Sequence, residues 1–348
     1  MTTAEQNLPS VGMVIEGRYR LLAILGRGGV GTVYEAERIT DGAVFALKRL
    51  DRAATHDKVA MGRFAREVRA ASAARSEYIA RVVDVGVDGD CPFLLMDRLR
   101  GEDLGARLHR VSRLGQREAV ELGRQVLAGL EAAHAAGVVH RDLKPDNIFL
   151  EERPQDDQNE DPPIRAKILD FGMSKIEPIG STLPLNLTRV GVAVGTPLYM
   201  SPEQASARPD VDARSDLYSV AAILFECLTG RPPHVGETSD VVLRTIRTTP
   251  APPIRRVASR IPRSLAQVID RALLGDRSAR YRTASEMRRA LEMCLPDLEG
   301  PLGGRATRTL WLAGFAAVAL GVMIAVATAS FLRGRLVTGA GAPSGTRP

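Results

Sequence analysis

The order of apolar and polar residues changes twice along the chain. In the first part, short apolar runs alternate with Gly-rich and Asp-Gly turns, a pattern typical of antiparallel strands joined by tight connections. We expect strands at residues 19–25, 30–38, 44–50, 78–87 and 92–96. Between residues 58 and 74 the spacing becomes helical, with Phe64, Val68 and Ala71 on one face. This part therefore predicts a small sheet accompanied by one helix.

After Gly101 the apolar positions recur at helical spacing in five amphipathic segments. These segments cover residues 117–136, 214–229, 239–248, 264–274 and 284–294. A β-rich beginning followed by a helix-rich remainder predicts an α+β architecture of two lobes. We place a short N-terminal extension at 1–18, the small lobe at 19–98 and the large helical lobe at 99–294.

A third pattern begins after a Pro-, Gly- and Arg-rich linker at 295–309. Residues 310–332 form an uncharged run of 23 residues that is apolar on every face. At about 1.5 Å per helical residue the run would be roughly 35 Å long, enough to cross a hydrocarbon core of about 30 Å. We expect one C-terminal transmembrane helix here, and a buried core helix is the alternative. The flanking arginines are nearly balanced, so they do not orient the span.

Composition and charge narrow the class of protein. The chain has 348 residues, of which 45% are hydrophobic and 25% charged, as in a folded protein with a sizeable core. The net charge is +6, and half of it comes from Arg333, Arg335 and Arg347 in the last 39 residues, which contain no acid. Residues 1–309 therefore carry only +3. This charge is too small and too scattered to predict nucleic-acid binding, which normally needs a concentrated basic face.

The cysteines and the first residues of the chain indicate a cytoplasmic setting. Cys91, Cys227 and Cys294 are far apart and form neither a disulfide framework nor a zinc-binding pattern. The first twenty residues are polar and show no signal peptide, so we expect the N-terminus in the cytoplasm.

The first chemical motif is the GxGxxG sequence formed by Gly26, Gly28 and Gly31. A dinucleotide-binding loop would lead from a strand into a helix, whereas here the chain continues as a strand. The sequence thus favours a hairpin flap whose backbone amides approach phosphate oxygens. An ordinary glycine-rich hairpin would be the alternative if no further motif followed. The flap residues expected to contact a nucleotide are Gly26, Arg27, Gly28, Gly29, Val30, Gly31 and Val33.

A lysine and a glutamate follow the flap. Lys48 ends the apolar run Phe45-Ala46-Leu47, and Glu67 comes nineteen residues later in the expected helix. Each residue taken singly would be an ordinary surface charge. In this order we expect Lys48 to hold the α- and β-phosphates of ATP and Glu67 to orient it through an ion pair, with Ala46 lining the nucleotide site.

The strongest signal is the run His140-Arg141-Asp142-Leu143-Lys144-Pro145-Asp146-Asn147. Asp170-Phe171-Gly172 begins 28 residues after Asp142. With these motifs the sequence resembles the eukaryotic-like protein kinase family, including its many bacterial serine/threonine members. The resemblance covers about residues 19–294, and it implies the two-lobed protein kinase fold, with a β-rich small lobe carrying one helix and a helical large lobe.

The resemblance also implies a role for each motif residue. Asp142 would be the proton acceptor, and Lys144 would neutralise the transferred phosphoryl group. Asn147 and Asp170 would ligate magnesium, with manganese as an alternative ion, and Met96 would lie beside the adenine where the lobes join. Phosphoryl transfer requires mainly in-line positioning and cations around the phosphoryl oxygens. A lysine two residues after the aspartate is the pattern of serine/threonine kinases.

The run Gly195-Thr196-Pro197-Leu198-Tyr199-Met200-Ser201-Pro202-Glu203 resembles the substrate-docking segment of the family. Ser201 stands where alanine is usual, a small change that puts little in doubt. On this resemblance Glu203 would form a structural ion pair with Arg280, and Asp216 would brace the backbone of the catalytic loop.

In the family that the sequence resembles, an arginine directly before the catalytic aspartate, here Arg141, goes with control by phosphorylation in the segment between Asp170 and Glu203, because the phosphate would pair with the arginine. We expect autophosphorylation at Thr188 first and Thr182 next, in trans between two copies of the chain. Residues 151–163 lengthen the connection before Asp170 and form an acidic loop that is either solvated or a docking site for a partner.

These features predict a membrane-anchored serine/threonine protein kinase that uses ATP and magnesium and acts on proteins, with no nucleic-acid partner. The kinase domain would face the cytoplasm, at a single-pass span in the cell membrane, and residues 333–348 would lie outside. A membrane-tethered pseudokinase scaffold is the alternative, although it should lack Lys48, Asp142, Asn147 or Asp170, and all four are present. A small-molecule kinase would normally lack the substrate-docking segment.

Overall fold

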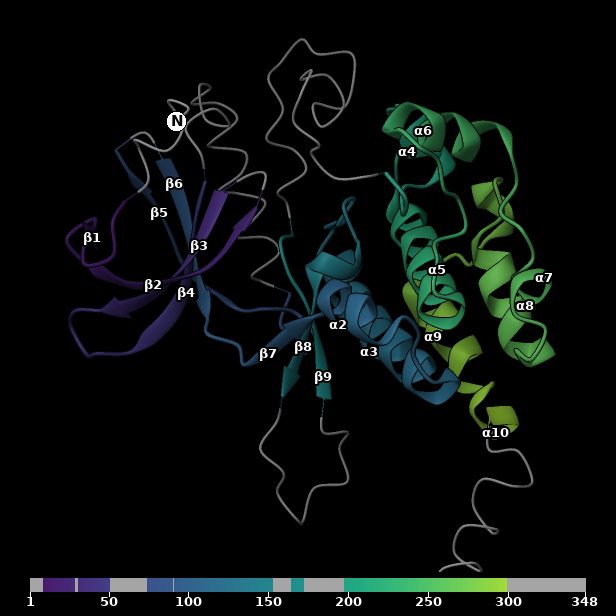
Figure 1. Cartoon of the computed structure of the whole chain (residues 1–348), viewed down its shortest axis with the longest axis horizontal. Coiled ribbons are helices and arrows are strands. Elements are labelled where there is room, and N and C mark those ends of the chain that lie inside the picture. The colour runs from purple at the N-terminus through teal and green to yellow at the C-terminus, as the bar shows by residue number, and fades with distance from the viewer. Residues whose placement is uncertain are drawn as a thin grey trace, which may run out of the picture. The chain divides into compact units, whose positions relative to one another are not determined.

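The computed structural model describes residues 9–28, 31–50, 74–89, 91–152, 164–171 and 197–298 (Figure 1). The chain divides into two compact units, residues 1–295 and 296–348. Four predicted features lie outside the described residues: the helix at 58–74, most of the acidic insertion, the segment with Thr182 and Thr188, and the membrane span at 310–332. Within the described ranges, no helix is both long and apolar enough to cross a membrane.

A six-stranded antiparallel sheet forms the N-terminal lobe, in the order β1-β2-β3-β4-β6-β5. Its strands are β1 (Val14–Ile15), β2 (Tyr19–Gly28), β3 (Gly31–Arg38), β4 (Val44–Leu50), β5 (Val82–Asp88) and β6 (Cys91–Asp97). The five expected strands are confirmed, although the one expected at 78–87 begins only at Val82. Their alternating residues Leu21, Tyr34, Leu47, Phe93 and Leu95 are fully buried and form one core cluster.

Strand β1 extends the sheet upstream of the expected lobe boundary at residue 19. Ile15 is fully buried in the same core cluster, and the Glu16 carboxylate accepts a hydrogen bond from the Val87 backbone N–H at 2.8 Å. The segment before Tyr19 is therefore part of the lobe. A two-residue strand is too short to show an alternating pattern, which is why the sequence did not predict it.

Helices dominate the C-terminal lobe. They are α2 (Leu104–Val111), α3 (Gln116–Ala135), α4 (Pro202–Ala205), α5 (Ala213–Thr229), α6 (Ser239–Thr248), α7 (Ile254–Val257), α8 (Arg263–Ala272), α9 (Ala284–Glu292) and α10 (Leu295–Leu298), with 3-10 turns η3 (Pro145–Asn147) and η6 (Arg277–Ala279). The five expected helices are confirmed within two residues at each end. Helix α5 packs against α3 and α8 and is buried along nearly its whole length. Asp212 caps its start and Gly230, at a φ of 81°, ends it.

A second, three-stranded sheet positions the functional loops. Its strands are β7 (Gly101–Asp103), β8 (Ile148–Glu152) and β9 (Ile164–Ile168), in the order β7-β8-β9. Ile148 pairs with Ile168, so the residues just before β8 meet those just after β9. The Ile168 N–H also donates to the Tyr78 carbonyl at 2.8 Å, and the Ala80 N–H donates to the Ile168 carbonyl at 2.9 Å. These bonds join the chain leading into β5 to the same sheet.

Candidate active site

The loop of residues 140–147, between α3 and β8, is fixed by Asp216 on α5. The fully buried Asp216 carboxylate accepts hydrogen bonds from the backbone N–H groups of His140 and Arg141, each at 2.9 Å. The expectation that Asp216 braces this loop is confirmed. His134, in the last turn of α3, contacts the same carboxylate through Nε2 at 2.8 Å. Sequence reasoning missed His134, whose only signal was its position six residues before His140.

His140 connects this loop to the segment that carries Asp170. Its buried ring places Nε2 2.8 Å from the Leu169 carbonyl oxygen, and its Nδ1 accepts from the Asp142 N–H at 3.3 Å. A single tautomer, with the proton on Nε2, satisfies both contacts. The ring also packs edge-on against Phe171, with centroids 4.7 Å apart. His140 thus holds the backbones of Asp142 and Asp170 in a fixed relation.

Arg141 and Asp170 have left-handed backbones, with φ of 67° and 59°. Residues with a Cβ seldom adopt this conformation, which costs about 1–3 kcal/mol at each position. The Asp216 and His140 hydrogen bonds described above hold both turns in place. The two left-handed residues lie directly before Asp142 and at Asp170 itself.

Lys144 and Asn147, two of the predicted catalytic and metal-binding residues, both contact Asp142. Lys144 Nζ lies 3.4 Å from Asp142 Oδ2. Asn147, which is buried, donates from Nδ2 to the Asp142 carbonyl oxygen at 2.6 Å. The Asp142 side chain remains 39% exposed, so its carboxylate can be reached by a hydroxyl group from solvent.

Lys48 and Asp170, 122 positions apart, form an ion pair with Nζ 2.5 Å from Oδ2. Lys48 comes from β4, and Asp170 follows β9. Their side chains are 14% and 19% exposed, so the pair is largely shielded. Glu67, the partner expected for Lys48, lies outside the described residues, and that pairing stays a prediction. The pair places a cation and a carboxylate together, one suited to phosphate and the other to a metal ion.

The glycine-rich sequence forms a hairpin, as expected, in which Gly28 at the end of β2 pairs with Gly31 at the start of β3. Gly29 and Val30 lie outside the described residues. The register continues across the sheet, because Val33 pairs with Gly26 on one side and with Lys48 on the other. The flap is therefore aligned with the Lys48–Asp170 ion pair.

Gly31 has a structural requirement that the sequence did not reveal. A Cβ atom at this position would lie 2.2 Å from the Arg49 carbonyl oxygen, inside any allowed contact distance. Gly31 thus lets β3 approach β4 closely. This role is separate from any contact of its amide with phosphate. At Gly26, by contrast, a Cβ would meet nothing within 4 Å.

We expect Gly31→Ala to weaken ATP binding about tenfold, because β3 must move away from β4 and shift the flap relative to Lys48, and one hydrogen bond to a charged group is worth roughly 1.5–3 kcal/mol. Gly275→Ala is the control, because an added Cβ there also meets nothing within 4 Å and the residue lies outside the flap; it should change affinity less than threefold. Titration of ATP by calorimetry measures both. Equal losses of affinity in the two variants would contradict the structural role of Gly31.

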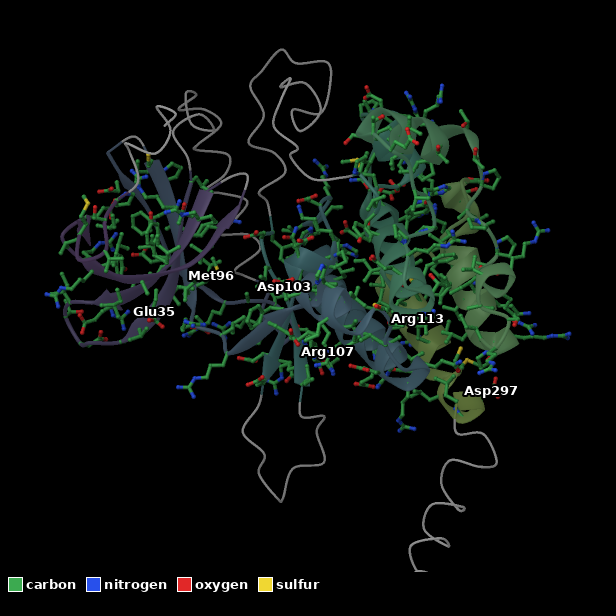
Figure 2. All side chains as sticks on the ribbon, viewed as in Figure 1. Glu35, Met96, Asp103, Arg107, Arg113 and Asp297 are labelled. Atoms are coloured by element: carbon green, nitrogen blue, oxygen red, sulfur yellow. The ribbon has the colours of Figure 1, made fainter. Side chains whose placement is uncertain are left out.

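Ala46 and Met96 are cross-strand partners where β4 meets the end of β6. Met96 is half-buried, and β6 ends at the next residue. Figure 2 shows Met96 at the sheet and Asp103 at the start of α2, on either side of the connection between the lobes. The predicted adenine-binding residues therefore lie where one lobe passes into the other.

Glu203 and Arg280 form the expected ion pair, with both guanidinium amino groups donating to the carboxylate at 2.8 and 2.9 Å. Both side chains are almost fully buried. Burial opposes ionisation of Glu203, but the hydrogen bonds and positive charge of Arg280 outweigh it and lower the pKa to about 2. This pair anchors the end of the substrate-docking segment to the C-terminal lobe.

Ser201, which departs from the family pattern within the docking segment, has a defined local role. It is fully buried and forms a reciprocal capping box with Gln204 at the start of α4. Gln204 also donates from Nε2 to the Arg141 carbonyl at 2.6 Å. The serine thus helps connect the docking segment to the loop of residues 140–147.

The donor set fits magnesium and ATP. Because Asn147 donates from Nδ2, its amide oxygen is left as an acceptor, and Asp170 supplies a carboxylate from the segment bonded to Asn147 through the Leu169 N–H at 2.9 Å. Magnesium is usually held by one or two carboxylates together with phosphate oxygens. Across the described ranges, no three His, Cys, Asp or Glu residues gather into an all-protein metal site.

Comparisons with known proteins agree with this geometry. The family model described as the protein kinase domain matches residues 19–291. The serine/threonine-protein kinase pkn3 of Myxococcus xanthus is 38% identical over 285 residues, covering 81% of this chain and 51% of that protein. PknH of Mycobacterium tuberculosis is 35% identical over 282 residues, covering 81% and 42%. The chain thus spans about half the length of these relatives, or less.

Among solved structures, the crystal structure of the Mycobacterium tuberculosis PknI kinase domain matches with a TM-score of 0.63 and 25% identity. That match covers 82% of this chain and 99% of the PknI chain. The fold, the order of the motifs and the family match agree. The chain belongs to the protein kinase family, among its bacterial, eukaryotic-like serine/threonine members.

Proposed function

We propose that this chain is an active serine/threonine protein kinase that transfers the γ-phosphoryl group of ATP to hydroxyl groups of proteins. The observation that carries the proposal is the convergence of five groups from three separate parts of the chain. They are Lys48, Asp142, Lys144, Asn147 and Asp170. A pseudokinase scaffold would not need all of them in one place.

Each group has a distinct task in phosphoryl transfer. Asp142 accepts the proton of the attacking hydroxyl group at its exposed carboxylate, while Lys144 balances the charge on the transferred group. Lys48 holds the phosphates from the opposite lobe and leaves its ion pair with Asp170 when ATP binds. Asn147 and Asp170 are the residues that would hold magnesium, which when bound neutralises charge on the phosphate oxygens.

Autophosphorylation of the segment between Asp170 and Glu203 is part of the proposal. Arg141 Nε is buried and has no hydrogen-bond partner among the described residues, so a phosphate on Thr188 or Thr182 would satisfy it. A phosphoryl group adds a charge of about −1.5 to −2 and accepts several hydrogen bonds from arginine. Reaction in trans within a homodimer would supply this phosphate.

Membrane attachment completes the proposal. The sequence pattern at 310–332 supports a single span, and ATP-dependent chemistry requires the kinase domain on the cytoplasmic side. Confinement to a surface would raise the local concentration of the kinase and favour reaction in trans.

The test is transfer of labelled γ-phosphate from magnesium ATP to the purified full-length chain and to a generic protein substrate, followed by mass-spectrometric mapping. We expect label on serine and threonine, first at Thr188, and none after magnesium is removed with EDTA. A Lys48→Met preparation measures the background from contaminating kinases. Transfer no higher than that background, with ATP still bound, would overturn the proposal in favour of the scaffold.

A further inference from the structure

One edge of the helical lobe concentrates positive charge. Figure 1 draws α7 and α8 at the outer edge of this lobe, and Figure 2 shows nitrogen-tipped side chains projecting from it. The stretch 241–269 contains six arginines and no acidic residue. Residues 1–309 carry +3 in total, so the rest of residues 1–309, outside this stretch, carries −3. The small overall charge conceals this local excess.

Four of these arginines lie within nine positions along α7, the following loop and the start of α8. They are Arg255, Arg256, Arg260 and Arg263, here called the arginine face. All four are exposed, and none forms an ion pair with any residue that the structure describes. Arg20, Arg81 and Arg110, which are also exposed, each pair with a carboxylate and serve as the comparison.

The backbone beneath the arginine face is firmly held. Ile254, Ile261 and Leu265 are buried on the opposite side of the same segment. The Ile254 N–H donates to Asp270 on α8 at 2.8 Å, which joins the two helices. Asp270 is the nearest acid along the chain, and this bond turns it toward the backbone. The backbone that carries the four exposed arginines is therefore a fixed support, on which the Arg255 guanidinium also donates to the Ser259 carbonyl at 3.3 Å.

We propose that the arginine face binds the anionic phospholipid headgroups of the membrane surface. An extended surface suits it better than a small ligand, because its arginines line neither the pocket of about 560 Å³ between α3 and β8–β9 nor that of about 300 Å³ beside α4 and η6. Each basic residue close to an anionic leaflet strengthens binding about fivefold. Four together hold the kinase domain against the bilayer.

The inference rests on the proposed membrane attachment. From the end of α10 at Leu298 to the expected span at residue 310, an extended chain reaches at most about 40 Å. The kinase domain would thus remain within reach of the headgroups. To be attracted, the arginines must come close to the headgroups. Attraction between exposed charges is screened beyond about 8 Å at physiological salt.

Arginine footprinting tests the proposal directly. The full-length chain is reconstituted in nanodiscs of phosphatidylcholine alone or rich in phosphatidylglycerol, treated with phenylglyoxal, and analysed by mass spectrometry at each arginine. We expect labelling of the arginine face to slow at least about fivefold in phosphatidylglycerol discs and to recover at high salt, while Arg20 and Arg81 stay unchanged. Equal labelling in the two lipids would overturn the proposal.

A pair of matched variants separates docking from local shielding. Arg255→Gln with Arg256→Gln should remove most of the lipid-dependent protection of Arg260 and Arg263, because the four arginines bind one surface together. Arg20→Gln with Arg81→Gln removes the same charge elsewhere and should leave that protection intact. Undiminished protection in the first variant would also overturn the proposal. Equal phosphoryl transfer in both variants shows that each is folded.

Failure of the span and failure of the arginine face give different results. Release of the chain from membranes by alkaline carbonate would refute the span alone. In that event, co-sedimentation of the full-length chain with phosphatidylglycerol vesicles, lost in Arg255→Gln with Arg256→Gln, still supports the arginine face, and no co-sedimentation refutes it. Resistance to carbonate without lipid-dependent protection refutes the arginine face and leaves the span standing.

Discussion

Replacing Asp142 by asparagine should lower the rate of phosphoryl transfer by about 10²–10⁴-fold, the range expected when a positioned general base is removed. Asparagine has nearly the same shape, but its amide cannot accept the proton of a substrate hydroxyl. The Asn147 side chain donates to the backbone carbonyl of residue 142 at 2.6 Å, a bond that survives the change. The loop should therefore keep its form while the chemical step fails. Steady-state rates with a peptide substrate, together with ATP affinity by calorimetry, measure this.

Asp146→Asn is the matched control, since it removes an exposed carboxylate from the same loop. Phosphoryl transfer should change less than threefold in that variant, and ATP affinity should be nearly normal in both. A similar loss of rate in the two variants would show that the negative charge of the loop matters in general, and that Asp142 has no special role. Loss of ATP affinity in Asp142→Asn alone would instead indicate that Asp142 supports nucleotide binding.

The sequence predicted the elements with strong periodicity and the residues with distinctive chemistry. Helices such as α6 and α8 and strands such as β3 are long enough to show their period, and the structure confirms them. Helix α5, expected to be amphipathic, is instead buried along nearly its whole length. The order of the motifs correctly anticipated that Asp216 would brace the catalytic loop and that Glu203 would meet Arg280. Both contacts join residues far apart in the chain, and only resemblance to a family could supply them.

The remaining features depend on tertiary contacts that leave little trace in sequence. Strands β1 and β7 have two and three residues, too few for a repeating pattern. The second sheet pairs β7 with β8, which are separated in the chain by α2, α3 and the catalytic loop. His134 has no motif of its own and gains its role from the Asp216 carboxylate. Gly31 stood in a phosphate-binding motif, whereas its tightest constraint is the Arg49 carbonyl on the next strand.

Replacing Arg280 by methionine should lower the free energy of unfolding by about 3–5 kcal/mol, because removal of one partner leaves a buried charge uncompensated. The Ser215 hydroxyl, which donates to Glu203 at 2.7 Å, carries no charge and cannot replace the arginine. The backbone carbonyl of Leu274, which accepts from Arg280 Nε at 2.7 Å, would lose its donor as well. Denaturant unfolding of the variant and the wild type measures the loss.

The control is Arg282→Met, two residues along the chain. Arg282 is 81% exposed and pairs with Glu286 at 3.8 Å, so its loss should cost less than about 1 kcal/mol. A cost for Arg280→Met no greater than for Arg282→Met would contradict the structural role of the buried pair. The wild-type rate of phosphoryl transfer should persist in Arg282→Met.

The pH dependence of stability tests the same pair independently. In the wild type the pKa of Glu203 is lowered to about 2, against an ordinary value near 4.5. The ion pair thus stabilises the fold fully above pH 4.5 and loses that contribution as the pH falls toward 2. In Arg280→Met, burial acts without the arginine and raises the pKa of Glu203 above its ordinary value. The cost of the substitution should then shrink as the pH falls from 7 to 4.5, because protonation removes the buried charge. A cost that stays constant over this range would show that Arg280 acts through packing and its carbonyl contacts, and that its charge contributes little.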